Sequence, residues 1–227
     1  MYKLYIKRIF DLTVGIIGFP FFLLSLILFG PIIRLTDNGP IFFKAKRIGI
    51  NGQLFTMYKF RSMYVNAPDI RNADGSTYNG KDDLRVTKIG RFIRSTSIDE
   101  LPQVLNILNG TMSLIGPRPD PPDDLQIYTE EQKGKLKVRP GLTGYNQAYY
   151  RNSAEQNEKF EHDLYYANNI SFWLDVKIFF RTIFMVLSHK SVYNDKSKPT
   201  TEEMLKYFGE KPACAKFDAE GETDAKE

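Results

Sequence analysis

The chain has 227 residues, of which 42% are hydrophobic and 26% charged, so its length suits one domain with appendages and its composition allows a buried core. The single cysteine, Cys214, excludes an intramolecular disulfide and fits a reducing compartment. The net charge of +4 is uneven, because residues 195–227 carry nine acids and six bases and thus leave +7 on the rest of the chain. This basic body suits anionic partners such as phospholipid head groups, nucleotides or nucleic acid.

The run from Leu12 to Ile33 contains no Lys, Arg, Asp or Glu. Its 22 residues would measure about 33 Å as a straight helix, enough to cross the hydrocarbon core of a membrane. Pro20 lies in the middle of the run, where proline removes a backbone hydrogen bond and kinks a helix. Basic residues flank the run on both sides, which favours a cytoplasmic position for both ends.

These features leave an ordinary spanning helix and a re-entrant helix as alternatives. We predict a re-entrant helix that enters one leaflet, breaks at Pro20 and returns, because this reconciles the proline with the flanking charges. A signal peptide is disfavoured, since its apolar region would be shorter and Phe29-Gly30-Pro31 is a poor cleavage site.

A turn cluster at 36–40 follows the apolar run. The segments 41–43 and 54–60 read as short strands around an Asn51-Gly52 hairpin turn. Farther on, residues 86–94 carry apolar side chains at helical spacing and predict a helix.

The next helix is predicted to start with a capping box, in which Ser97 is the N-cap and Glu100 occupies the third helical position. Its apolar stripe consists of Leu101, Val104, Leu105 and Leu108. The helix ends at Asn109-Gly110. A further, charged helix is predicted over residues 155–166.

Residues 172–189 combine apolar side chains with Asp175, Lys177 and Arg181, a charge density that forbids a spanning helix. The segment fits a helix in the membrane interface with Trp173 at head-group depth, or equally an amphipathic core helix. The polar composition beyond this helix predicts a flexible tail.

The resulting fold class is α+β and mainly helical: a re-entrant membrane helix plus a small cytosolic catalytic domain with interfacial amphipathic helices. The expected division is a membrane-dipping segment at 1–36, a catalytic domain at 37–193 and a flexible charged tail at 194–227.

Asp99 and Glu100 are the candidate chemical centre. Acids in the first turn of a helix also complement its dipole, and from these two residues alone that reading stays open. Arg91 and Arg94 lie a few residues upstream, and a helix N-terminus is itself an anion site. Adjacent helical residues project about 100° apart, so one carboxylate could attack a phosphorus while the other holds a metal.

Two other segments carry cations suited to a phosphate. Flanking prolines in Gly116-Pro117-Arg118-Pro119 stiffen the backbone, so that Arg118 loses less entropy when it clamps a ligand. Lys59 and Arg61 lie on one side of the strand predicted over 54–60. A rigid surface turn and solvated strand charges would have the same sequences. The chain contains neither a Walker loop nor a Rossmann fingerprint.

Six motifs follow one another along the chain: KRIFD (7–11), YKFRSM (58–63), RVTKIGRFIR (85–94), SIDELPQ (97–103), SLIGPRP (113–119) and RPGLTG (139–144). In this order they resemble the small monotopic polyprenol-phosphate phosphoglycosyl transferases, also called the bacterial sugar transferase family. The resemblance covers residues 5–193. One departure is Phe19, which precedes Pro20 where the family often has serine.

The resemblance implies a role for each matching residue. Asp99 matches the family's nucleophile, Glu100 its magnesium-binding partner, and Arg94 a phosphate-contacting arginine. Arg118 matches the arginine of the nucleotide-contacting loop. The remaining matches are the polar residues near the site, Lys59 and Asp163, and the residues that set the membrane helix at the interface, Lys7, Arg8 and Asp11.

The implied reaction moves a phosphosugar from a UDP-sugar to a polyprenol (undecaprenyl) phosphate through a covalent aspartyl intermediate, with Mg²⁺ as cofactor and UMP as product. Such an enzyme would initiate glycoconjugate assembly at the bacterial inner membrane, dipping into one leaflet with its catalytic domain facing the cytoplasm. Two alternatives are a membrane-anchored nucleotide-binding regulator without catalysis and a nucleic-acid-binding protein. The motif order and the apolar run argue against nucleic acid as a partner.

Overall fold

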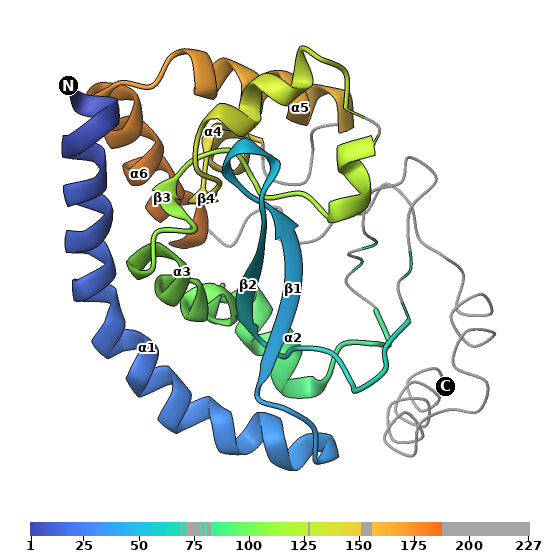
Figure 1. Cartoon of the computed structure of the whole chain (residues 1–227). Helices are drawn as coiled ribbons and strands as arrows, with labels where there is room; N and C mark the ends of the chain where they lie inside the picture. Colours follow the sequence, from blue (N-terminus) through green and yellow to red (C-terminus); the bar gives the residue numbers. More distant parts are fainter. Residues whose placement is uncertain are drawn as a thin grey trace, which may run out of the picture.

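A computed structural model describes residues 1–68, 70, 78, 80, 83–126, 128–150 and 156–187. This part of the chain is mainly helical and contains two small sheets, which confirms the predicted α+β, mainly helical class (Figure 1). Its helices and strands are α1 (Lys7–Asp37), β1 (Phe42–Ile48), β2 (Leu54–Phe60), α2 (Lys88–Ser95), α3 (Val104–Leu108), β3 (Ser113–Ile115), β4 (Gly141–Thr143), α4 (Tyr145–Tyr149), α5 (Gln156–Asn168) and α6 (Phe172–Leu187). Short π- and 3₁₀-helices lie between them: η1 (Tyr2–Ile6), η2 (Ile50–Gly52), η3 (Ile98–Gln103), η4 (Pro122–Gln126) and η5 (Gln132–Lys137). The tail predicted at 194–227 lies outside the described residues.

The N-terminal helix α1 is continuous over 31 residues and contains both Pro20 and Pro31. It curves around the edge of the domain (Figure 1). The break predicted at Pro20 is therefore not present. A proline removes only one intrahelical hydrogen bond, and α1 is supported along its length by packing against α3 and η3.

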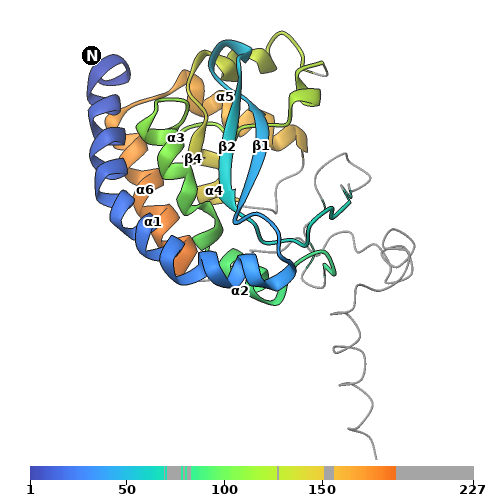
Figure 2. The same ribbon diagram turned by 60° about the horizontal axis from the view of Figure 1, so that its bottom comes forward.

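One face of α1 packs on the rest of the protein while the opposite face stays exposed and apolar. The buried side contains Lys7, Asp11, Gly15, Phe22, Ser25, Gly30 and Ile33. Large apolar residues that are more than half exposed are Ile9, Ile16, Ile17, Phe21, Leu24, Ile27, Leu28 and Leu35. Figure 2 shows α1 running along α3 and α6 and then past α2. By length and composition α1 could cross a membrane.

Strands β1 and β2 form the predicted hairpin, with Ile48 opposite Leu54 and Phe42 opposite Phe60. The first strand is longer than the predicted 41–43, because every residue from Phe42 to Ile48 lies opposite a residue of β2. The turn contains Asn51 at φ 55°, a conformation that asparagine tolerates.

The side chain of Asn106 on α3 completes the edge of β2. Its amide oxygen accepts a hydrogen bond from the Tyr58 N–H at 3.0 Å, and its amide nitrogen donates to the Thr56 carbonyl at 2.7 Å. Asn106 thus replaces the missing neighbour strand and docks α3, together with the preceding η3, against β2.

The predicted capping box at Ser97 is wrong. Ser97 adopts the left-handed conformation with φ 59°, and its side chain makes no capping hydrogen bond. The segment that follows is the 3₁₀-helix η3, and α-helical geometry begins only at Val104. The link from α2 consists of two residues, Thr96 and Ser97, so the backbone at Ser97 makes the turn instead of serving as an N-cap.

The two larger of the apolar clusters make up most of the core among the described residues. One joins the hairpin, α3, β3, α4, α5 and α6 around Met57, Ile107, Ile115, Tyr166 and Ile178. The other joins α1, α2 and η3 to the ends of the hairpin around Phe22, Ile33, Phe60, Ile93 and Val104. Helix α6 contributes to the core through Ile178, which confirms the amphipathic core helix, and it also exposes Trp173, Phe180 and Phe184. Its position in a membrane interface stays a prediction.

Candidate active site

The carboxylate of Asp99 lies where η3 meets β2 and α2. Its residue is only 8% exposed. The positive charges of Lys59 on β2, Arg94 in the last turn of α2 and Arg118 after β3 all act on it, as does the negative charge of Glu100. The tertiary structure therefore brings together five of the residues that the sequence proposed, from four separate segments.

Burial raises the pKa of Asp99 to about 6, despite the opposing effect of nearby cations. Desolvation disfavours the charged form, and Glu100 adds a like charge. Lys59, Arg94 and Arg118 lower the pKa, with Lys59 the strongest of them. The carboxylate is thus ionised at neutral pH and poorly hydrated, which are the properties of a nucleophile in a desolvated site.

Glu100 lies closer to solvent and is held by cations. Lys59 donates to its Oε1 from 2.6 Å, and the Arg118 Nη1 atom lies 4.0 Å from the same oxygen. The Glu100 side chain is 27% exposed and that of Arg118 is 52% exposed. A charged ligand approaching from solvent would therefore meet Arg118 and Glu100 before it reaches Asp99.

Helix α2 carries Arg94 to the site, and the first turn of this helix packs closely against the chain just after β2. Thr87 caps the helix by accepting a hydrogen bond from the Gly90 N–H at 2.9 Å. A Cβ atom at Gly90 would lie 1.9 Å from the Ser62 carbonyl oxygen, so only glycine permits this approach to the end of β2. Residue 94 is one turn farther along the same helix, beside η3.

Asp163 on α5 belongs to a neighbouring cluster. Its Oδ2 atom accepts a hydrogen bond from Lys135 at 2.9 Å, and Lys135 also pairs with Asp120. The hydroxyl of Tyr128 donates to Asp120 at 2.5 Å. Sequence reasoning missed Lys135, Asp120 and Tyr128, because an ion pair across 28 residues leaves no local pattern. The Asp163 cluster adjoins the site at the backbone around Arg118.

Arg61 binds the C-terminal end of α1, away from the Asp99–Glu100 centre. It is 7% exposed and donates to the carbonyls of Ile33 and Pro40 and to the carboxylate of Asp37, which closes the C-terminal end of α1. Lys59 and Arg61, two residues apart on one strand, therefore have different partners.

The three residues predicted at the membrane interface attach α1 to the rest of the protein. Lys7 pairs with Asp175 of α6 at 2.7 Å. Asp11 accepts hydrogen bonds from the Ser113 hydroxyl and the Leu114 N–H. Arg8 donates to the carbonyls of Ile107 and Leu108 at the end of α3. These contacts fix the angle of α1 relative to the site.

The donor set fits a divalent cation held jointly with a substrate. Within the described ranges, no three His, Cys, Asp or Glu side chains converge on one point. Mg²⁺ is commonly held by one or two carboxylates together with substrate phosphates, and it prefers oxygen ligands. Glu100, a partly exposed carboxylate beside Asp99, meets that requirement.

Comparison with known proteins identifies the family to which this chain belongs. The bacterial sugar transferase family model matches residues 2–189. The chain is 45% identical over 192 residues to the uncharacterized sugar transferase EpsL of Bacillus subtilis, which covers 82% of this chain and 90% of that protein. It is 35% identical to the undecaprenyl-phosphate galactose phosphotransferase of Salmonella typhimurium, covering 83% of this chain and 42% of that one.

A third relative is the UDP-glucose:undecaprenyl-phosphate glucose-1-phosphate transferase of Klebsiella pneumoniae, 40% identical over 75% of this chain and 39% of that protein. The chain thus spans less than half the length of these last two relatives, whose names state a reaction. It belongs to the bacterial sugar transferase family, and several of its relatives are named as undecaprenyl-phosphate sugar phosphotransferases.

Proposed function

We propose that this protein transfers a phosphosugar from a UDP-sugar to a polyprenol phosphate, undecaprenyl phosphate in bacteria, through a covalent intermediate on Asp99. The observation that carries the proposal is the buried Asp99 carboxylate under the charges of Lys59, Arg94 and Arg118. Two relatives whose names specify undecaprenyl phosphate support the acceptor, and the Klebsiella pneumoniae relative supports a UDP-sugar donor.

In the first half-reaction, an oxygen of Asp99 attacks the phosphorus that bears the sugar. The bond between that phosphorus and the bridging oxygen breaks, and UMP leaves with the bridging oxygen and its electron pair. The guanidinium groups of Arg94 and Arg118 face the charge that develops on the phosphate oxygens. Lys59 reduces the repulsion between two carboxylates and an anionic substrate.

In the second half-reaction, an oxygen of the lipid phosphate attacks the same phosphorus. The bond to Asp99 breaks, which restores the carboxylate and releases a polyprenyl diphosphosugar. Two steps suit two substrates that come from different phases, because UMP can leave before the lipid enters. The product would serve as the starting point for glycoconjugate assembly.

Glu100 is the residue proposed to hold Mg²⁺ together with the phosphate oxygens of the substrate. When bound, the ion would neutralise charge on the diphosphate. Glu100 remains outside the covalent chemistry, because Asp99 is the more deeply buried of the two carboxylates.

The exposed apolar face of α1 is proposed to lie in the cytoplasmic leaflet of the inner membrane. The face is continuous from Ile9 to Leu35, and basic residues occur before and after it. Both ends of α1 are bound to the same catalytic domain, Lys7 through Asp175 and Asp37 through Arg61. This double attachment supports a helix whose two ends stay on the same side of the membrane, because a helix crossing the bilayer would place its ends, and the parts of the domain bound to them, on opposite sides.

Mixing the enzyme with Mg²⁺ and a panel of UDP-sugars, without polyprenol phosphate, tests the proposal. We expect a burst of UMP of about one equivalent per active site and retention of the sugar label on the protein. Asp99→Asn should abolish both, whereas the exposed Asp123→Asn should retain both. Glu100→Gln should recover part of its activity at higher Mg²⁺ concentration.

Two results would contradict parts of the proposal. UMP release that requires the lipid acceptor would mean direct transfer without a covalent intermediate. An Asp99→Asn protein that is folded and turns over normally would remove Asp99 from the chemistry.

A further inference from the structure

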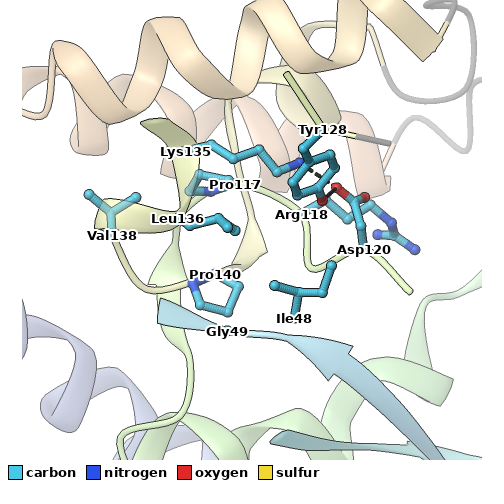
Figure 3. Close-up of a pocket in the computed structure, with 10 residues that line it drawn as sticks. All are labelled: Ile48, Gly49, Pro117, Arg118, Asp120, Tyr128, Lys135, Leu136, Val138 and Pro140. Atoms are coloured by element: carbon cyan, nitrogen blue, oxygen red, sulfur yellow. Dashed lines mark hydrogen bonds and ion pairs between the residues drawn. The ribbon is translucent and has the colours of Figure 1, made fainter. Parts of the chain in front are cut away.

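Lys135 lies at the centre of a buried cluster beside the active site. Its side chain is 4% exposed, and its ammonium contacts the carboxylates of both Asp120 and Asp163. Figure 3 shows Lys135 and Tyr128 converging on Asp120, with Arg118 adjacent on the same segment. The ammonium also lies 4.8 Å from the ring centre of Phe160, so charge and packing both hold it.

The cluster ties together three parts of the chain. Asp163 is on α5, Lys135 is on η5, and Asp120 is in the segment that follows β3. Burial alone would lower the pKa of Lys135, but Asp163 and Asp120 raise it overall, so the lysine remains a cation. A buried ammonium with two carboxylate partners resists displacement, because each carboxylate would lose its counter-charge.

The segment 116–120 is held at points on either side of Arg118. The Gly116 N–H donates to Thr143 and the Pro117 carbonyl accepts from Gly141, which anchors the beginning. Beyond Arg118, the Asp120 carbonyl accepts from the Ile48 N–H at 3.0 Å, and the Asp120 side chain binds Lys135.

The Arg118 side chain approaches the active site through its guanidinium group, at the exposed end of the side chain. Its guanidinium lies 4.0 Å from Glu100, with half of the side chain in solvent. Its direction therefore depends on the backbone that carries it. Burial raises the pKa of Asp163 to about 6, and the backbone N–H of Arg118 is close enough to oppose this rise, which places the cluster beside residue 118.

We propose that Lys135 is a positioning residue for the nucleotide-sugar substrate. By joining Asp120 to Asp163, it holds the backbone of 117–120 so that Arg118 stands at the Asp99–Glu100 centre. The role of Arg118 in substrate binding rests on the proposed function. The ordering of residues 117–120 by Lys135 is independent of the proposed function, so an experiment can test the two claims separately.

The functional test is a double-mutant cycle with Lys135→Met and Arg118→Ala, read as kcat/KM for UMP release. Lys135→Met should lower kcat/KM about tenfold, mainly through a higher KM, because a displaced Arg118 loses binding. In the Arg118→Ala background the same change should cost less than about twofold, since the residue through which Lys135 acts is already absent. Equal losses in both backgrounds would overturn the proposal.

The structural test is hydrogen exchange, measured on the protein without substrate. Between residues 117 and 122, Arg118 and Asp120 alone carry backbone N–H groups, because the other four residues are prolines. Lys135→Met should accelerate deuterium uptake in a peptide covering this segment. Unchanged uptake would overturn the proposal. If wild-type enzyme releases no UMP, the proposed function fails while this measurement still decides whether Lys135 orders the segment.

Lys133→Met is the matched control, because Lys133 is two residues away, 42% exposed and paired only with Glu130 among the ion pairs of the described residues. It should leave both readouts at wild-type values. If Lys135→Met does not fold, Tyr128→Phe replaces it in both tests. That change removes the hydroxyl that donates to Asp120 while it keeps the ring, and it should give smaller shifts in the same directions. A folded Tyr128→Phe protein with wild-type uptake and kcat/KM would then count against the proposal.

Discussion

Lys59 and Glu100, which are 41 residues apart in sequence, form an ion pair with 2.6 Å between Nζ and Oε1. The pair links the end of β2 to η3 at the mouth of the site. It also places an ammonium on the carboxylate that we propose as the magnesium ligand. Lys59 therefore acts in two ways: it lowers the pKa of Asp99, and it would compete with a metal ion for Glu100.

Replacing Lys59 should separate these two effects. In Lys59→Met, Mn²⁺ used as a probe should bind more tightly in the absence of nucleotide, because the competing ammonium is gone. The rate of UMP release should nevertheless fall, since the substrate loses a cation. Titration of free Mn²⁺ by electron paramagnetic resonance checks the first effect. The exposed Lys46→Met serves as the control, and weaker Mn²⁺ binding in Lys59→Met would contradict the competition.

The first half-reaction should depend on pH through Asp99. Its pKa is raised to about 6 and only the carboxylate can attack, so kcat/KM for UMP release should rise with pH up to about 6 and then level. Lys59 lowers this pKa, and Lys59→Met should move the midpoint upward. Rapid-quench measurements between pH 5 and 8 provide the profile, and an unmoved midpoint in Lys59→Met would count against Asp99 as the titrating group.

The same pKa predicts that Asp99→Asn stabilises the protein. Since the folded-state pKa is above the ordinary value of 3.8, wild-type stability is complete below about pH 4 and falls as pH rises towards about 6. At pH 8 the amide should therefore raise the free energy of unfolding by about 1–3 kcal/mol. At pH 4 the two proteins should unfold alike.

Denaturant unfolding in detergent at the two pH values checks this prediction. Asp123→Asn, at an exposed position, should change nothing at either pH. Destabilisation by Asp99→Asn at pH 8 would show that the ionised carboxylate contributes more to the fold than its burial costs.

Arg94 should not tolerate replacement by lysine. A guanidinium can contact two phosphate oxygens at once, whereas an ammonium keeps the charge without the planar geometry. We expect Arg94→Lys to lose at least about tenfold in the rate of UMP release. Arg91→Lys, three residues earlier on the exposed side of α2, should stay near wild type. Near-normal turnover in Arg94→Lys would contradict this prediction, because it would show that Arg94 contributes only its positive charge.

The topology of α1 is tested by introducing cysteines at exposed positions on either side of it. In a Cys214→Ser background, Lys3→Cys and Lys44→Cys should react with an impermeant reagent from the same membrane face. The two attachments of α1 to one domain are the physical reason. Labelling of the two cysteines from opposite membrane faces would show instead that α1 is an ordinary spanning helix.

Local sequence was sufficient for much of the fold. An uncharged apolar run located α1, apolar spacing located α2, the mixed apolar and charged composition of two later segments located α5 and α6, and Asn51-Gly52 located the hairpin. Helices and turns can be predicted in this way because they depend on neighbours a few residues away. Local patterns singled out the five residues around the candidate centre, and the motif resemblance gave each of them a role. That resemblance named Asp99 and Arg118 without showing that they meet.

The tertiary structure decided the features that depend on distant partners. Ser97 fits a capping box by its spacing, yet the turn between α2 and η3 forces it into a left-handed conformation. Lys7 and Asp11 match the interface positions of the family, yet their partners are Asp175 and Leu114. A buried charge takes whichever counter-charge the fold brings within reach, and residues 168 positions apart, such as Lys7 and Asp175, become neighbours only after the chain has packed.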